Sequence, residues 1–148
     1  MKIVLDANAA IDWFIPTPEG EAYSSHLIPL VNSGDIRFVV PLHFDIEVTA
    51  HLVKKHRRLP QQYPINWLNT TLDVLDALPI DITGQGINFS LLGKLAATYS
   101  LTPYDVPYFQ LARLMEIPIA TRDRGIISAS KHWHVLHWQL KGKNGHGR

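Results

Sequence analysis

The sequence predicts an α/β fold in which a mainly parallel sheet of four or five strands lies between two layers of helices. Short apolar runs alternate along the chain with longer segments whose apolar residues recur at helical spacing. Such alternation is typical of a parallel sheet covered on both faces. The chain has 148 residues, is 46% hydrophobic and shows no repeat or internal boundary, so we expect one folded domain over residues 1–140.

The expected strands are short apolar runs that end at a polar residue or a proline. The first run is continuous and rich in β-branched residues, and Asp6 ends it. Pro41 closes the second run. The full set covers residues 2–5, 38–40, 80–82, 117–120 and, as an edge strand, 135–138.

The segments between these strands have the apolar spacing and stop signals of helices. Phe44, Val48 and Leu52 recur at i, i+4 and i+8 along one face, and Gly34 ends an earlier helix. We expect a short helical turn at residues 9–14 and helices at 19–32, 42–57, 67–75, 87–99, 103–116 and 124–130. Residues 141–148 contain glycines and no large apolar side chain, so we expect a flexible C-terminal tail.

The composition excludes several classes of protein. There is no cysteine, which rules out disulfides, thiolate-bound zinc and a thiol nucleophile. No stretch of about 18 apolar residues is present, and the apolar run at the N-terminus is too short for a signal peptide. We therefore expect a cytoplasmic protein with no membrane partner. The net charge of +1 does not by itself indicate nucleic acid.

Four acidic residues interrupt this apolar pattern. Asp6 and Asp123 lie at or just past the carboxyl ends of two expected strands, where α/β folds bind their ligands. Glu47 and Asp105 fall on the apolar stripes of two expected helices. An unpaired buried carboxylate is costly, so Glu47 needs either a metal or a partner such as His51 on the next turn.

Each of the other three acids also has a purely structural interpretation. Asp6 and Asp123 could be the N-caps of the helices that follow them, because Asp is a favoured N-cap. Asp105 could complete a capping box with Thr102, three residues earlier. Taken one at a time, capping is the favoured interpretation of these three residues.

Taken together, the four acids point to a cation site. Two carboxylates about 4 Å apart repel each other by roughly 4 kcal/mol at an effective dielectric constant near 20. Several carboxylates in one pocket would therefore take up protons or recruit a cation. Oxygen ligands without cysteine favour Mg²⁺ or Mn²⁺, either of which can activate water for attack on a phosphodiester.

Four neighbouring polar residues are candidates for supporting roles. Asn8 and Thr121 lie two residues from Asp6 and Asp123, where each could orient a carboxylate, bind water or make ordinary turn hydrogen bonds. Arg122 and Arg124 flank Asp123. They could contact a phosphate near the metal or offset the negative charge of the pocket.

The order and spacing of these motifs resemble those of PIN-domain ribonucleases over about residues 1–138. Residues 3–8 (IVLDAN) are similar to the opening strand of that family, and residues 45–47 (DIE) fall where it carries a helix-borne glutamate. Residues 102–105 (TPYD) with 108–112 (YFQLA) resemble its third acidic motif, and residues 118–123 (PIATRD) its fourth. By length and third motif, the chain is most similar to VapC-type toxins.

The resemblance implies a PIN-like three-layer sandwich and a Mg²⁺- or Mn²⁺-dependent endoribonuclease. It implies a homodimer that a VapB-type antitoxin inhibits, and RNA products with 5′-phosphate and 3′-hydroxyl ends. The four acids of the family carry over to Asp6, Glu47, Asp105 and Asp123. One departure is Pro107, which would remove a hydrogen bond if the helix began just after Thr102 and would be tolerated if it began nearer Tyr104.

Other functions fit the sequence less well. A catalytically silent PIN-like protein that binds RNA or acts as a scaffold would not require all four acids. A small phosphatase could use Asp6 as its nucleophile, but no well-placed lysine follows a later strand. A signalling receiver needs an aspartate beyond a central strand, whereas Asp81 lies inside its short strand.

Overall fold

The centre of the molecule is a parallel β-sheet. The computed structural model describes residues 1–84, 86–132 and 137–138, and in these residues the sheet has five strands in the order β3-β2-β1-β4-β5. The strands are β1 (Lys2–Leu5), β2 (Arg37–Val40), β3 (Ile80–Ile82), β4 (Ile119–Ala120) and β5 (His137–Trp138). Every pair of neighbours is parallel, which confirms the expected sheet.

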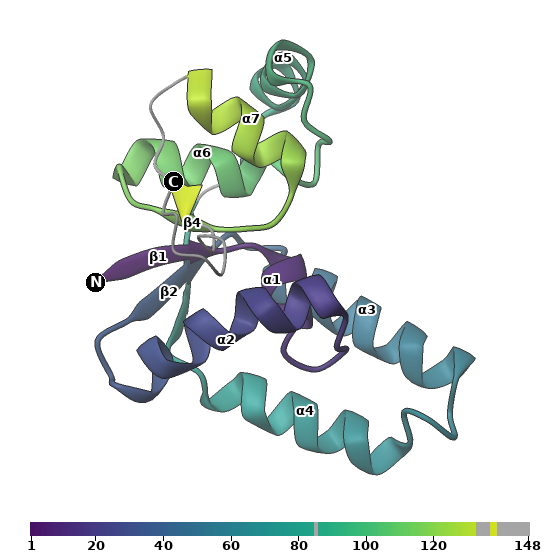
Figure 1. Ribbon diagram of the computed structural model, residues 1–148. Coiled ribbons are helices and arrows are strands. Elements are labelled where there is room, and N and C mark those ends of the chain that lie inside the picture. The colour runs from purple at the N-terminus through teal and green to yellow at the C-terminus, as the bar shows by residue number, and fades with distance from the viewer. Residues whose placement is uncertain (85, 133–136, 139–148) are drawn as a thin grey trace.

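Helices cover both faces of this sheet. They are α1 (Ala7–Ile11), α2 (Pro18–Asn32), α3 (Phe44–Arg58), α4 (Ile65–Ala77), α5 (Phe89–Tyr99), α6 (Val106–Met115) and α7 (Arg124–His132). Figure 1 shows α1 to α4 on one side of the sheet and α5 to α7 on the other. The expected three-layer α/β arrangement is therefore confirmed.

The central strand β1 is apolar after its first residue, Lys2, because both of its faces are covered. Ile3, Val4 and Leu5 are fully buried, and Val4 pairs with Val39 on one side and Ile119 on the other. This central position makes the carboxyl end of β1 the natural focus of a site. Asp6 is the first residue beyond it.

The helix expected at residues 103–116 begins later, at Val106. Thr102 organises a turn instead, since its Oγ1 accepts a hydrogen bond from the amide of Asp105 at 3.2 Å. Pro107 then lies in the first turn of α6, where a missing N–H removes no helical hydrogen bond. Asp105 therefore lies just before α6, and the expectation that it falls on the apolar stripe of this helix is wrong.

Other expected boundaries differ from the structure or lie outside the described residues. The helical turn expected at residues 9–14 is α1, which begins at Ala7 directly after β1 and ends at Ile11. The expected tail at residues 141–148 and the domain end at residue 140 fall outside the described part of the chain. In the part that is described, no helix combines the length and apolarity that crossing a bilayer requires.

Candidate carboxylate site

Four separate elements bring the acidic residues to one end of the sheet. Asp6 follows β1, Asp123 lies between β4 and α7, Glu47 is in the first turn of α3 and Asp105 precedes α6. The strands β1 and β4 are parallel neighbours, so their carboxyl ends lie side by side. The other three acids all lie close enough to Asp6 to repel its charge.

Asp6 is the buried member of the group, with 2% of its surface exposed. Burial raises the pKa of Asp6 from 3.8 to about 7 because desolvation disfavours the charged form. A hydrogen bond from Thr121 Oγ1 to Asp6 Oδ2, 2.8 Å long, opposes this increase in pKa. Repulsion from the three other carboxylates increases the pKa further.

Asp105 experiences the same kinds of effect. Partial burial is the main cause that raises its pKa, and the charges of Asp123 and Glu47 add to it. The side chain of Thr102 and the charge of His43 act in the opposite direction. The charge of the group therefore disfavours full ionisation in the absence of a cation.

The capping interpretation holds for one of the three aspartates. Asp123 Oδ2 accepts a hydrogen bond from the amide of Ile126 at 2.8 Å, so Asp123 caps α7. Asp6 and Asp105 occupy the N-cap positions of α1 and α6, but their side chains accept no capping hydrogen bond. Capping therefore does not explain the carboxylates of Asp6 and Asp105.

Glu47 pairs with Tyr108 and not with His51, the partner that the sequence offered as an alternative to a metal. Tyr108 Oη donates a hydrogen bond of 2.7 Å to Glu47 Oε1, and His43 Nε2 lies 3.6 Å from the same oxygen. Burial and the negative charge of Glu47 raise the pKa of Tyr108, so its hydroxyl stays protonated and donates. His51 is exposed, because the buried face of α3 consists of Phe44, Val48 and Leu52.

Three of the carboxylates share one feature of their hydrogen bonding. In Asp6, Glu47 and Asp123, a protein donor engages one carboxylate oxygen. The second oxygen of each has no donor among the residues that the structure describes. Each side chain is thus oriented by the protein and still has an oxygen with which to bind a cation.

The donor chemistry fits a hard divalent cation. All four side chains offer oxygen, and the charges of the other three add to the effect of burial in raising the pKa of Asp6. Across residues 1–84, 86–132 and 137–138, no three acidic or histidine side chains already surround a point where an ion could bind. The carboxylates would therefore have to approach one another when a cation binds.

The supporting residues expected from the sequence differ in their contacts. Thr121 orients a carboxylate as expected, and its Oγ1 also accepts a hydrogen bond from the amide of Asp123 at 2.9 Å. Asn8 is exposed on α1 and Arg124 is exposed at the start of α7. The roles of Asn8 and Arg124 remain predictions.

Arg122 makes a contact that the sequence analysis missed. Its Nε and Nη2 donate to the two carboxylate oxygens of Asp12, 2.6 and 2.7 Å away, and Asp12 is buried. A Cβ at Gly20 would lie only 2.6 Å from Asp12 Oδ1, so α2 also packs tightly against this ion pair. The pair connects the loop that carries Asp123 to the layer formed by α1 and α2.

Removal of this ion pair gives a stability prediction with a matched control. Arg122→Ala leaves the buried Asp12 carboxylate without its partner. About one-third of the surface of the Arg122 side chain is exposed. We expect a loss of about 1–3 kcal/mol in the free energy of unfolding, less than for a fully buried pair. Arg124→Ala, two residues away and exposed, should leave stability unchanged. Equal urea unfolding midpoints for the two variants would contradict this assignment.

A protein-family model identifies the family to which this chain belongs. The family model described as "PIN domain" matches residues 3–131 of this chain. The chain belongs to the PIN-domain family. The family expected from the motifs is therefore confirmed, and PIN domains are generally nucleases.

Comparison with solved structures agrees with the PIN-domain fold. The crystal structure of PAE2754 from Pyrobaculum aerophilum aligns with a TM-score of 0.58 over 87% of this chain and 84% of that chain. The two chains are 16% identical, so their likeness concerns the fold alone. A search of curated proteins found no match to this chain.

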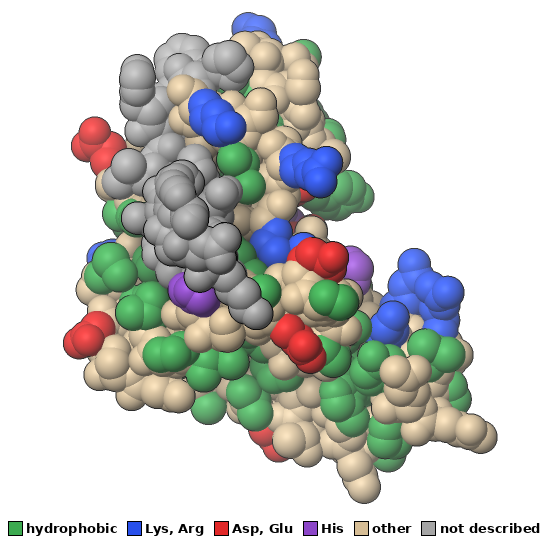
Figure 2. All heavy atoms as spheres, viewed as in Figure 1, with side chains coloured by type: hydrophobic (Ala, Val, Ile, Leu, Met, Phe, Trp, Pro, Cys, Tyr) green, Lys and Arg blue, Asp and Glu red, His purple; other side chains and the backbone are tan. Residues whose placement is uncertain are grey.

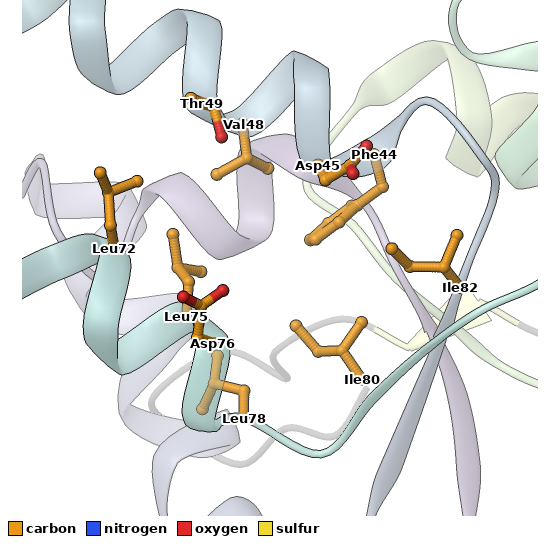
Figure 3. Close-up of a pocket in the computed structure, with 10 residues that line it drawn as sticks. All are labelled: Phe44, Asp45, Val48, Thr49, Leu72, Leu75, Asp76, Leu78, Ile80 and Ile82. Carbon is orange, nitrogen blue, oxygen red and sulfur yellow. The ribbon is translucent and has the colours of Figure 1, made fainter.

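A separate apolar groove in this PIN domain does not include the four acids. It lies between α3, α4 and β3, with a volume of about 200 Å³, and Figure 3 shows its apolar side chains with Asp45 and Asp76 beside them. Phe44 and Val48 line it from α3, whereas Glu47 is bonded to Tyr108 on α6. The groove and the carboxylate site therefore use different surfaces of α3.

Proposed function

We propose that this PIN domain is a Mg²⁺- or Mn²⁺-dependent endoribonuclease that hydrolyses phosphodiester bonds in RNA. The observation that carries the proposal is that four separate elements place Asp6, Glu47, Asp105 and Asp123 at one end of the sheet. Burial raises the pKa of Asp6, and the charges of the other three acids raise it further, which agrees with this arrangement. Four acids from four elements repel one another at the carboxyl ends of β1 and β4, where α/β folds bind ligands. Membership of a family of nucleases supports the same reaction.

The proposed roles follow from the position of the four carboxylates and from the free oxygens of three of them. Asp6, Glu47, Asp105 and Asp123 would hold the cation. When bound, such a cation supplies activation of a water nucleophile and stabilisation of charge at the departing 3′ oxygen. Thr121 Oγ1 donates a hydrogen bond to the Asp6 carboxylate and accepts one from the backbone N–H of Asp123. Through these two bonds Thr121 would orient two of the cation ligands.

Basic side chains are available near the fold's surface for RNA phosphates. Arg124 is exposed next to Asp123, and the last turn of α3 carries Lys55, Arg57 and Arg58. Figure 2 shows Lys and Arg side chains gathered over that end of α3. Phosphate contacts of this kind contribute affinity without sequence specificity.

We further propose that the protein acts in the cytoplasm as the toxin of a VapBC-type pair. The similarity of residues 102–112 to the third acidic motif of VapC-type toxins supports this role, and with it a homodimer and a VapB-type antitoxin. A short antitoxin-like reading frame directly beside the gene is the expected genomic arrangement. Co-expression of that product should relieve growth inhibition by this chain, and unchanged inhibition would contradict the toxin role.

Mn²⁺ should raise the thermal stability of the folded protein. A cation that binds only the folded state at a concentration of 100 Kd adds about 2.7 kcal/mol. We therefore expect the melting temperature to rise with millimolar Mn²⁺ and to return to its original value with EDTA. A melting temperature that does not respond to Mn²⁺ would argue against a cation site.

Thr121 should contribute to cation affinity through Asp6. Thr121→Val keeps the buried shape but removes the hydroxyl that orients Asp6 and accepts from Asp123. We expect Mn²⁺ affinity to fall by about 10–100-fold, the usual effect of losing a group that orients a ligand. Thr121→Ser keeps the hydroxyl and serves as the control. Calorimetric titration that gives equal affinities for the two variants would rule out this role.

One observation supports a second candidate function, a catalytically silent PIN-like protein that binds RNA or acts as a scaffold. Among the described residues, no three acids or histidines are already arranged around one point. RNA binding without cleavage across several RNAs and metals would support this alternative. A phosphatase that uses Asp6 is disfavoured, because Asp6 is buried and hydrogen-bonded to Thr121.

A further inference from the structure

Tyr108 is a buried residue whose hydroxyl reaches the carboxylate site. It lies in the first turn of α6, three residues after Asp105, and is fully buried. By periodicity alone it is one of the apolar residues along α6. In the fold its hydroxyl donates to Glu47 Oε1 at 2.7 Å, across 61 residues of sequence.

A second contact joins the same two helix starts. His43 Nε2 lies 3.1 Å from the carbonyl oxygen of Tyr104, just before Asp105. The rings of His43 and Tyr108 meet edge to face, with their centroids 5.3 Å apart and their planes at 70°. The start of α3, which carries Glu47, is therefore held against the start of α6, which carries Asp105.

We propose that Tyr108 is a positioning residue that holds the Glu47 carboxylate in place for the divalent cation and sets its spacing from Asp105. The inference rests on the proposed function, since it concerns the same cation site. Glu47 is a long side chain with 28% of its surface exposed, and the charges of Asp6 and Asp105 repel it. Without the hydroxyl of Tyr108, that repulsion would favour conformations in which Glu47 turns toward solvent.

Tyr108→Phe tests this role because it removes only the hydroxyl and keeps the buried ring. The readout is the Kd for Mn²⁺, measured by calorimetry without RNA. We expect the Kd to rise by about 10–100-fold. The matched control is Tyr63→Phe, which removes a phenol between α3 and α4 whose hydroxyl accepts a hydrogen bond from Gln62. This control should leave the Kd unchanged.

A double-mutant cycle distinguishes positioning from a general effect on folding. In a Glu47→Ala background no side chain remains for Tyr108 to hold, so adding Tyr108→Phe should change the Kd much less than it does in the wild type. An equal change in both backgrounds would overturn the inference, because the effect would not act through Glu47.

RNA cleavage provides a second readout of the same role. In Tyr108→Phe, the Mn²⁺ concentration for half-maximal cleavage should rise by the same factor as the Kd, and saturating Mn²⁺ should restore the rate. Wild-type affinity for Mn²⁺ in Tyr108→Phe would overturn the inference and leave the proposed function standing. Failure of the wild-type protein to bind Mn²⁺ would instead contradict the proposed function, and the inference with it.

Discussion

Asp105→Asn should lower the rate of RNA cleavage by a factor on the order of 10²–10³, the range seen when a preorganised electrostatic contact is lost from an active site. The change removes a negative charge but keeps the shape of the side chain and the turn around Thr102. The backbone N–H of residue 105 would still donate a hydrogen bond to Thr102 Oγ1 in the variant. The loss of activity would therefore reflect the carboxylate rather than the position of α6.

The control for this experiment is an acid that lies outside the carboxylate site. Asp45 lies in the first turn of α3, two residues from Glu47, and is exposed beside the apolar groove. Asp45→Asn should cleave RNA at the wild-type rate, and EDTA should abolish cleavage by both wild-type and Asp45→Asn proteins. Equal rates for Asp105→Asn and the wild type would remove Asp105 from the site.

The second large effect is a loss of stability of the metal-free protein as the pH rises. The pKa of Asp6 is 3.8 in its ordinary state and about 7 in the fold, so the folded protein binds a proton that the unfolded chain releases between these values. The contribution of Asp6 to the free energy of unfolding is complete below about pH 4 and is lost as the pH rises through about 7. The total change is at most about 4 kcal/mol, at 1.36 kcal/mol for each pKa unit.

Asp6→Asn isolates this contribution because it is neutral at every pH. In EDTA, this variant should match the wild-type protein in stability near pH 4 and exceed it by a few kcal/mol near pH 8. Asp81→Asn is a control in which the pH dependence of stability has the opposite sign. Arg37 lowers the pKa of the exposed Asp81, so this variant should become less stable than the wild type as the pH rises. A constant difference between Asp6→Asn and the wild type across this pH range would contradict the raised pKa.

The gain in stability of Asp6→Asn should come with a loss of cation binding. Addition of Mn²⁺ should reverse the order of the two proteins at neutral pH, because only the wild type keeps all four carboxylates. This exchange of stability for a functional charge is the pattern expected of a site that is strained until its ligand binds.

The sequence allowed the layers to be predicted and the four acids to be singled out as a candidate site, because both depend on local patterns. The apolar run before Asp6 and the stripe of Phe44, Val48 and Leu52 are visible without a structure. Position at the carboxyl ends of neighbouring parallel strands then follows from a general rule of α/β folds. The start of α6 was misplaced because Thr102 could cap a helix or organise a turn equally well.

The hydrogen-bond partners of the site could not be predicted from local patterns. Tyr108 and Glu47 are 61 residues apart, and Arg122 and Asp12 are 110 residues apart. A tyrosine on an apolar stripe is indistinguishable from an ordinary core residue until the opposite helix is placed. For Glu47, His51 was the nearer partner in sequence, but it lies on the exposed side of α3.

The central claim is that Asp6, Glu47, Asp105 and Asp123 together bind a divalent cation. Crystals of the protein soaked in Mn²⁺ and measured for anomalous scattering test it most directly. We predict one or two anomalous peaks bounded by these four carboxylates, and loss of those peaks in Asp6→Asn crystals. Absence of a peak among the four carboxylates at a Mn²⁺ concentration that supports RNA cleavage would contradict the claim.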